Sequence, residues 1–576
     1  MFIKFFFIKK LPNYFLFVKL YYIMLNILNK YKYVLLTVLL AITAICITFY
    51  HNIGLIIDCG REAYYPQEIL NGKVLYKNLF NIYAPFAYLF NAFLYKIFGI
   101  NLNILCISGA FCAFGIITGI FLLTKILFND KLAFYISFFA VITGITSVYV
   151  FNYVFPYAFG MTYGFCAFIF SLLFLIYYLN CKKHVYNIYI YASLFLAGLA
   201  ICCKYEFILY LLVYIPVFIK KRSSFLTLFK GLLCFGLVPE MCFAFLWAHG
   251  LRLHDIINSI RIVLTMSHTQ TLKYFYIHSG VFPHKYSLIA LSVTFLALFI
   301  PFFMYMVPVV FKDKIKNPVL GLIFTYGAFC IMLLFKNNTA YDVFMSLPFV
   351  LLLVAIFNYK KIFNNLSVLV VVSSVLLVSL KSFWGIILNS YGTYYLPILL
   401  IAIAICFKDK LTEKDWDYTG FYILVLSILI GFYNLNFIKA KSNLIQTSKG
   451  KIYTEKKYET TNKLLEFIEK NTQKTDKIII FPEGMMINFL SNRKTDDFYN
   501  SMIPLYEETF GVDKYVEHFK KSMPEYIIFN SWNSSDYYFS IICEDYGFKF
   551  CEFVQKNYEE KIKLSGDFSY IVYKKK

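Results

Sequence analysis

Long apolar runs separated by short polar segments make up most of the chain as far as residue 437. Each run approaches the length of about 20 residues that an α-helix needs to cross a bilayer, and most of them contain no charge. The pattern therefore predicts a polytopic α-helical membrane protein with about thirteen transmembrane helices. We place these helices at residues 33–50, 103–124, 132–150, 157–178, 185–202, 205–219, 226–248, 287–311, 318–335, 341–358, 363–382, 393–407 and 419–437.

The pattern changes near residue 438, where the apolar runs shorten and charged residues become frequent. From there on, apolar residues at helical spacing alternate with short apolar runs of strand length. This arrangement predicts a small extracytoplasmic α/β domain at residues 438–576. Its predicted elements are helices at 455–472 and 512–522 and strands at 477–481, 525–530 and 569–573.

Composition supports a membrane protein and excludes a soluble globular one. Hydrophobic residues make up 60% of the chain, charged residues only 15%, and the mean hydropathy is +0.64. The formal net charge is +22, but the segment 438–576 is nearly neutral, with 20 of the 33 acidic residues and 22 of the 55 Lys and Arg. The positive charge therefore belongs to the loops between the apolar runs. It indicates membrane topology, and we expect no nucleic-acid partner.

The basic loops alternate with the apolar runs and set the predicted orientation. By the positive-inside rule, the loops rich in Lys and Arg face the cytoplasm. Residues 1–32 are then a basic cytoplasmic or interfacial segment, and 33–437 form the transmembrane domain. The predicted cytoplasmic loops contain residues 181–184, 220–222, 312–316, 359–361 and 408–414, and the outward loops are 51–102, 249–286, 336–340 and 383–392.

The first outward loop, residues 51–102, holds an unusual group of acids. No acidic residue precedes Asp58, and Glu62 and Glu68 then follow within eleven residues. Asp58 comes directly after an apolar run, so we expect it at the membrane boundary, where partial desolvation makes a carboxylate a better proton acceptor. The structural alternative is an Asp that caps the first of two helices lying along the membrane surface.

The loop resembles the first outer loop of GT-C glycosyltransferases, in particular bacterial proteins akin to the protein O-mannosyltransferase and aminoarabinose-transferase families. The order D-x-G-R-E, G-K-V-L-Y-K-N, Y-A-P-x-x-Y, F-G carries this resemblance. The segments NYVFPYAFG, CKYEF and SYGTYYLP, and the tail, extend it over essentially the whole chain. The matching positions are Asp58, Arg61, Glu62, Gly72, Tyr76, Pro85 and Tyr391. One departure is Asn78, where many relatives have an Asp.

The resemblance implies a polyprenyl-phosphate-linked sugar donor and a catalytic Asp at position 58, with Glu62 as a second carboxylate. Gly72, Tyr76, Pro85 and Tyr391 would shape the loops around the site. Transfer from a lipid phosphate also needs cations for the departing phosphate. The outward-facing candidates are Arg61, Lys204, Arg252 and Arg261. For Lys204, an ion pair with Glu206 that only satisfies two charges near the membrane is an equal alternative.

We expect no cofactor and no resident metal. The five histidines of 249–286 match no compact metal-ligand spacing, although Asp58 with Glu62 is a conceivable divalent-cation site. Cys543 and Cys551 could form a hairpin disulfide, but the sequence favours two separate thiols. The sequence FPEG after the strand at 477–481 could be a catalytic or phosphate-binding loop, but a single Gly is a weak signal, and an ordinary strand-to-helix turn is favoured.

The sequence thus predicts an inverting glycosyltransferase in a bacterial cytoplasmic membrane, acting at the outer face on a lipid, glycan or protein acceptor. Two alternatives remain. One is a transporter or flippase of lipid-linked sugars, although no internal repeat typical of transporters is found. The other is a GT-C-like assembly protein without activity, which the departure at Asn78 keeps open.

Overall fold

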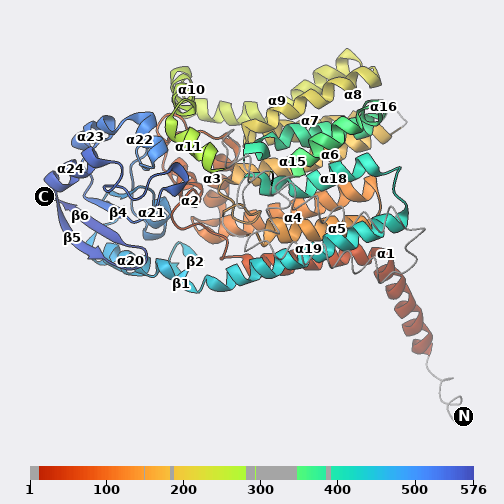
Figure 1. The fold of residues 1–576 in the computed structure, drawn as a ribbon, viewed down its shortest axis with the longest axis horizontal. Helices are drawn as coiled ribbons and strands as arrows, with labels where there is room; N and C mark the ends of the chain where they lie inside the picture. The colour runs from red at the N-terminus through yellow and green to blue at the C-terminus, as the bar shows by residue number, and fades with distance from the viewer. Residues whose placement is uncertain (1–11, 148–149, 182–186, 280–291, 293–346, 385–390) are drawn as a thin grey trace, which may run out of the picture.

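The computed structural model describes residues 12–147, 150–181, 187–279, 292, 347–384 and 391–576. A bundle of long helices occupies one half of the molecule, and a body of strands and shorter helices that ends at the C-terminus occupies the other (Figure 1). The first turns of α1 (Pro12–Thr48) project from the end of the bundle away from the C-terminal body.

Six of the described helices are long and apolar enough to cross a membrane, so the chain is a multi-pass membrane protein. Shorter apolar helices pack among them. The six spans lie in α1, α4 (Leu102–Leu127), α6 (Phe159–Asn180), α9 (Phe225–Ala248), α17 (Leu366–Val378) with η4 (Ser379–Trp384), and α19 (Glu413–Ala440). The shorter helices include α7 (Asn187–Cys203), α15 (Leu347–Phe357) and α18 (Leu396–Phe407).

Two of the predicted spans, 287–311 and 318–335, lie outside the described residues except for residue 292. Several others are not uniform α-helices. The span predicted at 132–150 is α5 (Asp130–Ala140) followed by a π-helical turn, η1 (Val141–Ile145). The span predicted at 205–219 begins as a 3₁₀-helix, η3 (Tyr205–Val213), and continues as α8 (Tyr214–Lys221). Hydropathy predicts the length of such segments but does not distinguish an α-helix from a 3₁₀- or π-helix, which differ in hydrogen-bond pattern.

Small residues allow the helices of the bundle to approach closely, as is common in membranes. A Cβ on Gly198 of α7 would lie 1.9 Å from the carbonyl oxygen of Phe235 in α9. On Gly109 of α4 it would lie 1.7 Å from the carbonyl oxygen of Val154. The contact at Gly109 places the loop that contains Val154 directly against α4.

The C-terminal body contains a four-stranded sheet in the order β3-β4-β6-β5. The strands β3 and β4 are parallel, and β6 is antiparallel to both β4 and β5. The predicted strands at 477–481, 525–530 and 569–573 coincide with β3, β4 and β6. The sequence analysis missed β5, whose YEEKIKL sequence is that of a mostly solvated edge strand. The bounds are β3 (Ile478–Phe481), β4 (Tyr526–Asn530), β5 (Tyr558–Leu564) and β6 (Tyr570–Lys575).

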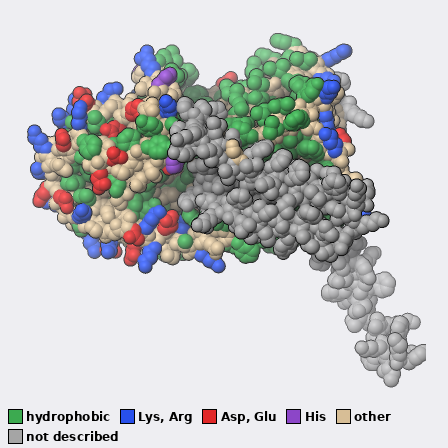
Figure 2. Space-filling model, in the orientation of Figure 1, with side chains coloured by type: hydrophobic (Ala, Val, Ile, Leu, Met, Phe, Trp, Pro, Cys, Tyr) green, Lys and Arg blue, Asp and Glu red, His purple; other side chains and the backbone are tan. Residues whose placement is uncertain are grey.

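Helices and a hairpin complete the C-terminal body. The hairpin of β1 (Asn443–Thr447) and β2 (Gly450–Thr454) directly follows the span α19. Charged side chains of both signs cover this body, whereas the described surface of the bundle is mainly hydrophobic (Figure 2). The helices are α20 (Thr460–Asn471), α21 (Met485–Ser491), α22 (Pro504–Phe510), α23 (Val512–Lys521) and α24 (Phe548–Asn557).

Two helices of the first outward loop lie where the halves meet, α2 (Cys59–Leu70) and α3 (Phe86–Phe98). Sequence analysis placed both along the membrane surface. The structure adds that residues 59–68 of α2 are buried and that α2 packs against α21 of the C-terminal body. Gly60 makes this approach possible, since a Cβ there would lie 2.3 Å from the backbone nitrogen of Met486. The hydropathy of α2 gives no information about α21, the helix that packs on it from more than 400 residues later in the sequence.

Cys543 and Cys551 form a disulfide, so the favoured prediction of separate thiols is wrong and the alternative of a hairpin disulfide is confirmed. The bond links the loop before α24 to the helix itself.

The disulfide should contribute to stability. Closing a loop of this length lowers the entropy of the unfolded chain, which stabilises the folded protein by about 2–3 kcal/mol. We therefore expect dithiothreitol to lower the melting temperature of the wild-type protein. A Cys543→Ala/Cys551→Ala variant should melt at the lower temperature with or without reductant. A wild-type protein insensitive to reduction would contradict this expectation.

Candidate active site

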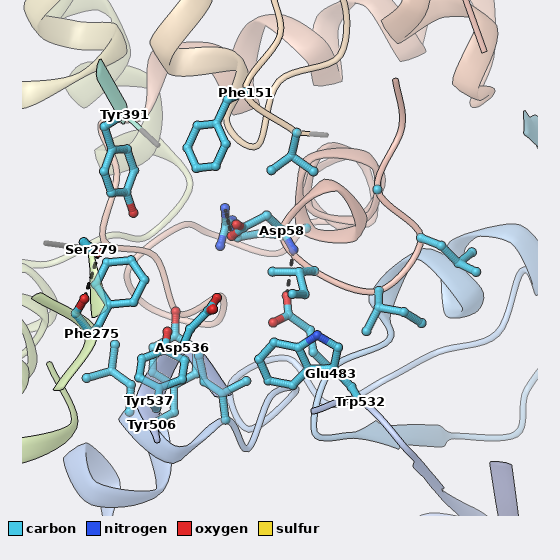
Figure 3. A pocket seen from close by; sticks show the side chains of 18 of the residues that line it. Asp58, Phe151, Phe275, Ser279, Tyr391, Glu483, Tyr506, Trp532, Asp536 and Tyr537 are labelled. Atoms are coloured by element: carbon cyan, nitrogen blue, oxygen red, sulfur yellow. Dashed lines mark hydrogen bonds and ion pairs between the residues drawn. The ribbon is translucent and has the colours of Figure 1, made fainter. Parts of the chain in front are cut away.

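A cavity of about 750 Å³ lies between the helical bundle and the C-terminal body (Figure 3). Its walls come from segments far apart in the sequence. The bundle side and first outward loop contribute Asp58, Arg61, Tyr83, Phe151 and Tyr391, the C-terminal body contributes Glu483, Tyr506, Trp532, Asp536 and Tyr537, and α11 (Gln270–His278) and its C-cap contribute Phe275, His278 and Ser279.

Asp58 stands on the cavity wall in a strained turn immediately before α2. Its backbone has φ 60° and ψ −57°, and the N–H of Cys59 donates to the carbonyl of Ile57 at 2.6 Å. These values describe a three-residue γ-turn that is rare for a residue with a side chain. Within the described part of the chain, Asp58 makes no side-chain capping bond to α2, so the helix-cap interpretation does not apply. Strained backbones of this kind cluster at functional sites.

Arg61 holds the Asp58 carboxylate. Its Nη2 donates to Asp58 Oδ1 at 3.1 Å and to the Tyr157 carbonyl at 3.3 Å, and its Nε donates to the Tyr88 hydroxyl at 3.1 Å. The guanidinium carbon lies 4.7 Å from the centre of the Tyr83 ring. The side chain of Arg61 is 9% exposed and that of Asp58 is 28% exposed. The carboxylate is therefore the more accessible member of the pair.

Glu62, the second predicted carboxylate, is buried behind Arg61. It accepts hydrogen bonds from the Tyr88 hydroxyl at 2.7 Å and from the Phe159 N–H, at the start of α6, at 2.8 Å. Its Oε1 lies 3.4 Å from Arg61 Nε. Burial raises the pKa of Glu62, and the charge of Arg61 opposes that rise. Glu62 is not among the described residues that line the cavity, and its contacts support Arg61.

Lys204 belongs to a row of charges next to the cavity. Its Nζ donates to the Tyr157 hydroxyl and lies 3.5 Å from Glu206, which in turn lies 3.5 Å from Lys381. The Nζ of Lys381 is 3.9 Å from the centre of the Tyr391 ring. Tyr391 lines the cavity, whereas Lys204 is separated from it by aromatic rings. The structure thus includes the Lys204–Glu206 ion pair and adds Lys381, which the sequence did not single out.

The two other predicted phosphate ligands lie elsewhere. Arg252 and Arg261 are exposed, at the start and in the middle of α10 (Leu253–Ser267). Neither is among the described residues that line the cavity, although Val263 and Met266 of the same helix are. The structure does not bring these two arginines to Asp58.

The predicted loop-shaping residues set the path of the first outward loop. Gly72 has φ 87° and Tyr76 has φ 68°, and the Tyr76 hydroxyl donates to the carbonyl of Tyr83 at 2.6 Å. Pro85 precedes the first residue of α3. Asn78 accepts the backbone N–H four residues before it at 3.0 Å, so its side chain stabilises a turn of this loop.

Several cavity residues were not predicted from the sequence, and one of them, Glu483, hydrogen-bonds to Asp58. Its Oε1 accepts the Asp58 N–H at 3.0 Å, and its side chain is buried. Lys441 also lines the cavity, as do His278 and Asp536, which lie 3.2 Å apart. One signal could have identified Glu483. It follows the carboxyl end of a parallel strand, the edge where sites in α/β folds form.

No group of three or more His, Cys, Asp or Glu side chains is arranged to hold a metal ion in the described part of the chain. Asp58 and Glu62 are the pair considered for a divalent cation. Each forms an ion pair with the Arg61 guanidinium through one carboxylate oxygen. These contacts give the two carboxylates a cationic partner within the protein itself.

Comparison with known proteins gives structural likenesses only. No family model matches the sequence, and no curated protein matches it. The chain is similar to the structure of ArnT from Cupriavidus metallidurans bound to undecaprenyl phosphate, with 13% identity, 94% of this chain and 98% of that chain covered, and a TM-score of 0.42. It is also similar to the oligosaccharyltransferase AglB from Archaeoglobus fulgidus in complex with an inhibitory peptide and a dolichol-phosphate, with 12% identity, coverages of 87% and 70%, and a TM-score of 0.47.

Proposed function

We propose that this protein is a membrane glycosyltransferase that moves a sugar from a polyprenyl-phosphate-linked donor to an acceptor at the outer face of a bacterial cytoplasmic membrane. The observation that carries this proposal is the Asp58 carboxylate, held by Arg61 on the wall of a large cavity at the end of the bundle. The GT-C-like pattern of the first outward loop supports the same assignment of Asp58 as the general base.

In the proposed step, the Asp58 carboxylate takes the proton of the acceptor hydroxyl or amine as that group attacks the anomeric carbon. A bond forms from the acceptor atom to this carbon. The bond from the carbon to the phosphate oxygen breaks, and its electron pair leaves with the polyprenyl phosphate. Attack opposite the departing phosphate inverts the anomeric configuration.

Arg61 is the proposed ligand of the departing phosphate. Among the described residues, its contacts use Nε and Nη2, so Nη1 remains for a phosphate oxygen. A guanidinium stabilises the developing charge best in a site that excludes water. Lys204 would add positive potential from behind Tyr157. Arg252 and Arg261 would attract the lipid phosphate at the membrane surface.

The proposed orientation places the C-terminal body and the cavity outside the cytoplasm. Lys220 and Lys221 end α8, and α16 (Tyr359–Asn364) contains Lys360 and Lys361. Both helices lie at the end of the bundle opposite the C-terminal body (Figure 1). By the positive-inside rule, that end is cytoplasmic.

The proposal predicts binding of the lipid product by its phosphate. In detergent, undecaprenyl phosphate should raise the melting temperature of the purified protein, whereas undecaprenol at the same concentration should not. A ligand present at 100 times its Kd stabilises the folded state by about 2.7 kcal/mol, which is readily detected. Equal shifts with both lipids, or no shift with either, would contradict a phosphate site.

A further inference from the structure

Glu483 lies in the C-terminal body, at the border with the first outward loop. It follows β3 and precedes α21, and the Asn530 side chain at the end of the parallel strand β4 donates to its carbonyl at 2.8 Å. The side chain is 5% exposed and lines the large cavity. A carboxyl group fixed at the end of two strands is held more precisely than one on a free loop.

The contact between Glu483 and Asp58 involves the strained turn. The Asp58 N–H donates to Glu483 Oε1 at 3.0 Å (Figure 3). From the other side, the Arg61 backbone N–H donates to the Asp58 carbonyl at 3.0 Å, and Arg61 Nη2 holds the Asp58 carboxylate. A strained conformation persists only where its surroundings over-determine it. Glu483 is the part of those surroundings that comes from the C-terminal body.

The junction around this contact is tightly packed. Gly60 lies against the backbone of Met486, three residues after Glu483, with no room for a Cβ. The Tyr64 hydroxyl accepts the Thr495 N–H at 3.1 Å. The turn at Asp58 is therefore held between the bundle and the C-terminal body.

We infer that Glu483 is a positioning residue for Asp58, so that the C-terminal body completes the active site of the transmembrane domain. The Glu483 carboxyl accepts the Asp58 N–H and keeps the carboxylate of Asp58 at the cavity wall. This inference rests on the proposed function and adds to it a residue 425 positions away in the sequence.

The charges around Glu483 indicate how it acts. Burial, and then the charge of Asp58, raise the pKa of Glu483 to about 8, and Arg61 opposes the rise. The phenols of Tyr65 and Tyr506 also face it, and their own pKa values are raised by burial. Glu483 therefore stays protonated to a higher pH than an ordinary carboxyl does, and as a neutral group it still accepts the Asp58 N–H. When it ionises, it places a second negative charge beside Asp58.

The test compares E483A and E483Q with the wild-type protein and with the control E507A. Glu507 is a matched control because burial also raises its pKa and it accepts one backbone N–H, that of Gly547, at 3.2 Å, away from the cavity. The donor is the lipid-linked sugar fraction extracted from a strain that lacks this protein, and the acceptor is the membrane fraction of that strain. Initial rates are measured from pH 6 to pH 9.

We expect E483A to lower kcat about 100-fold with little change in KM, because a base displaced by about 1 Å loses that much rate. E483Q, which keeps a neutral acceptor, should recover most of this loss. When Glu483 ionises at alkaline pH, its charge opposes the negative charge that develops on the departing phosphate, so the wild-type rate should fall there, and the E483Q rate should not. E507A should behave as the wild-type protein does.

Two results would overturn the inference: E483A with the kcat of the wild type, or E483Q with the same alkaline fall in rate as the wild type. If E483A does not fold, the pH profile of E483Q decides alone. Absence of transfer by the wild-type protein would instead contradict the proposed function, so the two failures are distinct.

Discussion

Replacement of Asp58 by Asn is expected to lower the rate of sugar transfer by about 10²–10⁴-fold, the usual contribution of a general base. The amide can still accept the hydrogen bond from Arg61 Nη2, and Asn tolerates positive φ better than most residues. The variant should therefore fold normally and lose activity through chemistry alone. The measurement is the initial rate of transfer, with the melting temperature of each protein determined in parallel.

The matched control is Asp497→Asn. Asp497 forms an ion pair with Lys73, so it too joins the C-terminal body to the first outward loop. It is not among the described residues that line the cavity, and its replacement should leave the rate unchanged. Equal rates in Asp58→Asn and Asp497→Asn would show that Asp58 is not the base.

Replacement of Arg61 by Met is expected to destabilise the protein by about 3–5 kcal/mol, the cost of removing one partner from a buried ion pair. Arg61 and Glu62 are 9% and 1% exposed. Burial raises the pKa of Glu62, and the charge of Arg61 limits this rise. Without the guanidinium, the pKa of Glu62 rises further. A carboxyl with a raised folded-state pKa stabilises the fold at low pH and less as pH rises. The destabilisation should therefore be larger at pH 8 than at pH 5.

A double-mutant cycle separates this effect from the loss of packing. Arg61→Met/Glu62→Gln should be more stable at pH 8 than Arg61→Met alone, because no buried charge remains without a partner. As a control, Lys549→Met breaks an exposed ion pair with Asp513 and should change stability little. Denaturant unfolding in detergent measures the wild type, the Arg61→Met and Glu62→Gln single variants, the double variant and Lys549→Met. An Arg61→Met variant equally destabilised at pH 5 and pH 8 would contradict this role of Glu62.

The sequence contains enough information to predict the long helices and the residues at the start of α2. The length and apolar character of a spanning helix are set by the bilayer around it, and both can be recognised in the sequence. Most predicted spans therefore coincide with described helices. Asp58 and Arg61 are three residues apart, so their proximity follows from one turn of local structure.

What could not be predicted depends on contacts between distant segments. The fit of Gly60 against Met486 has no local signature, and it brings Glu483 to Asp58 and buries α2. Cys543 and Cys551 are eight residues apart, but their pairing depends on a turn with positive φ at Cys543. Lys381 reaches Glu206 only after distant helices have packed. In each case, hydropathy and residue spacing predict the local structure of a segment, but they do not predict which distant segment packs against it.

The most direct test of the central claim compares surface glycans by mass spectrometry in three strains: intact, lacking the protein, and carrying Asp58→Asn at normal protein levels. We predict that both altered strains lack the same sugar and accumulate its polyprenyl-phosphate-linked donor. The mass difference would then identify the sugar and the acceptor together. If the deletion changes the glycans and Asp58→Asn does not, Asp58 is not the catalytic base, and a transporter of lipid-linked sugars becomes the better account.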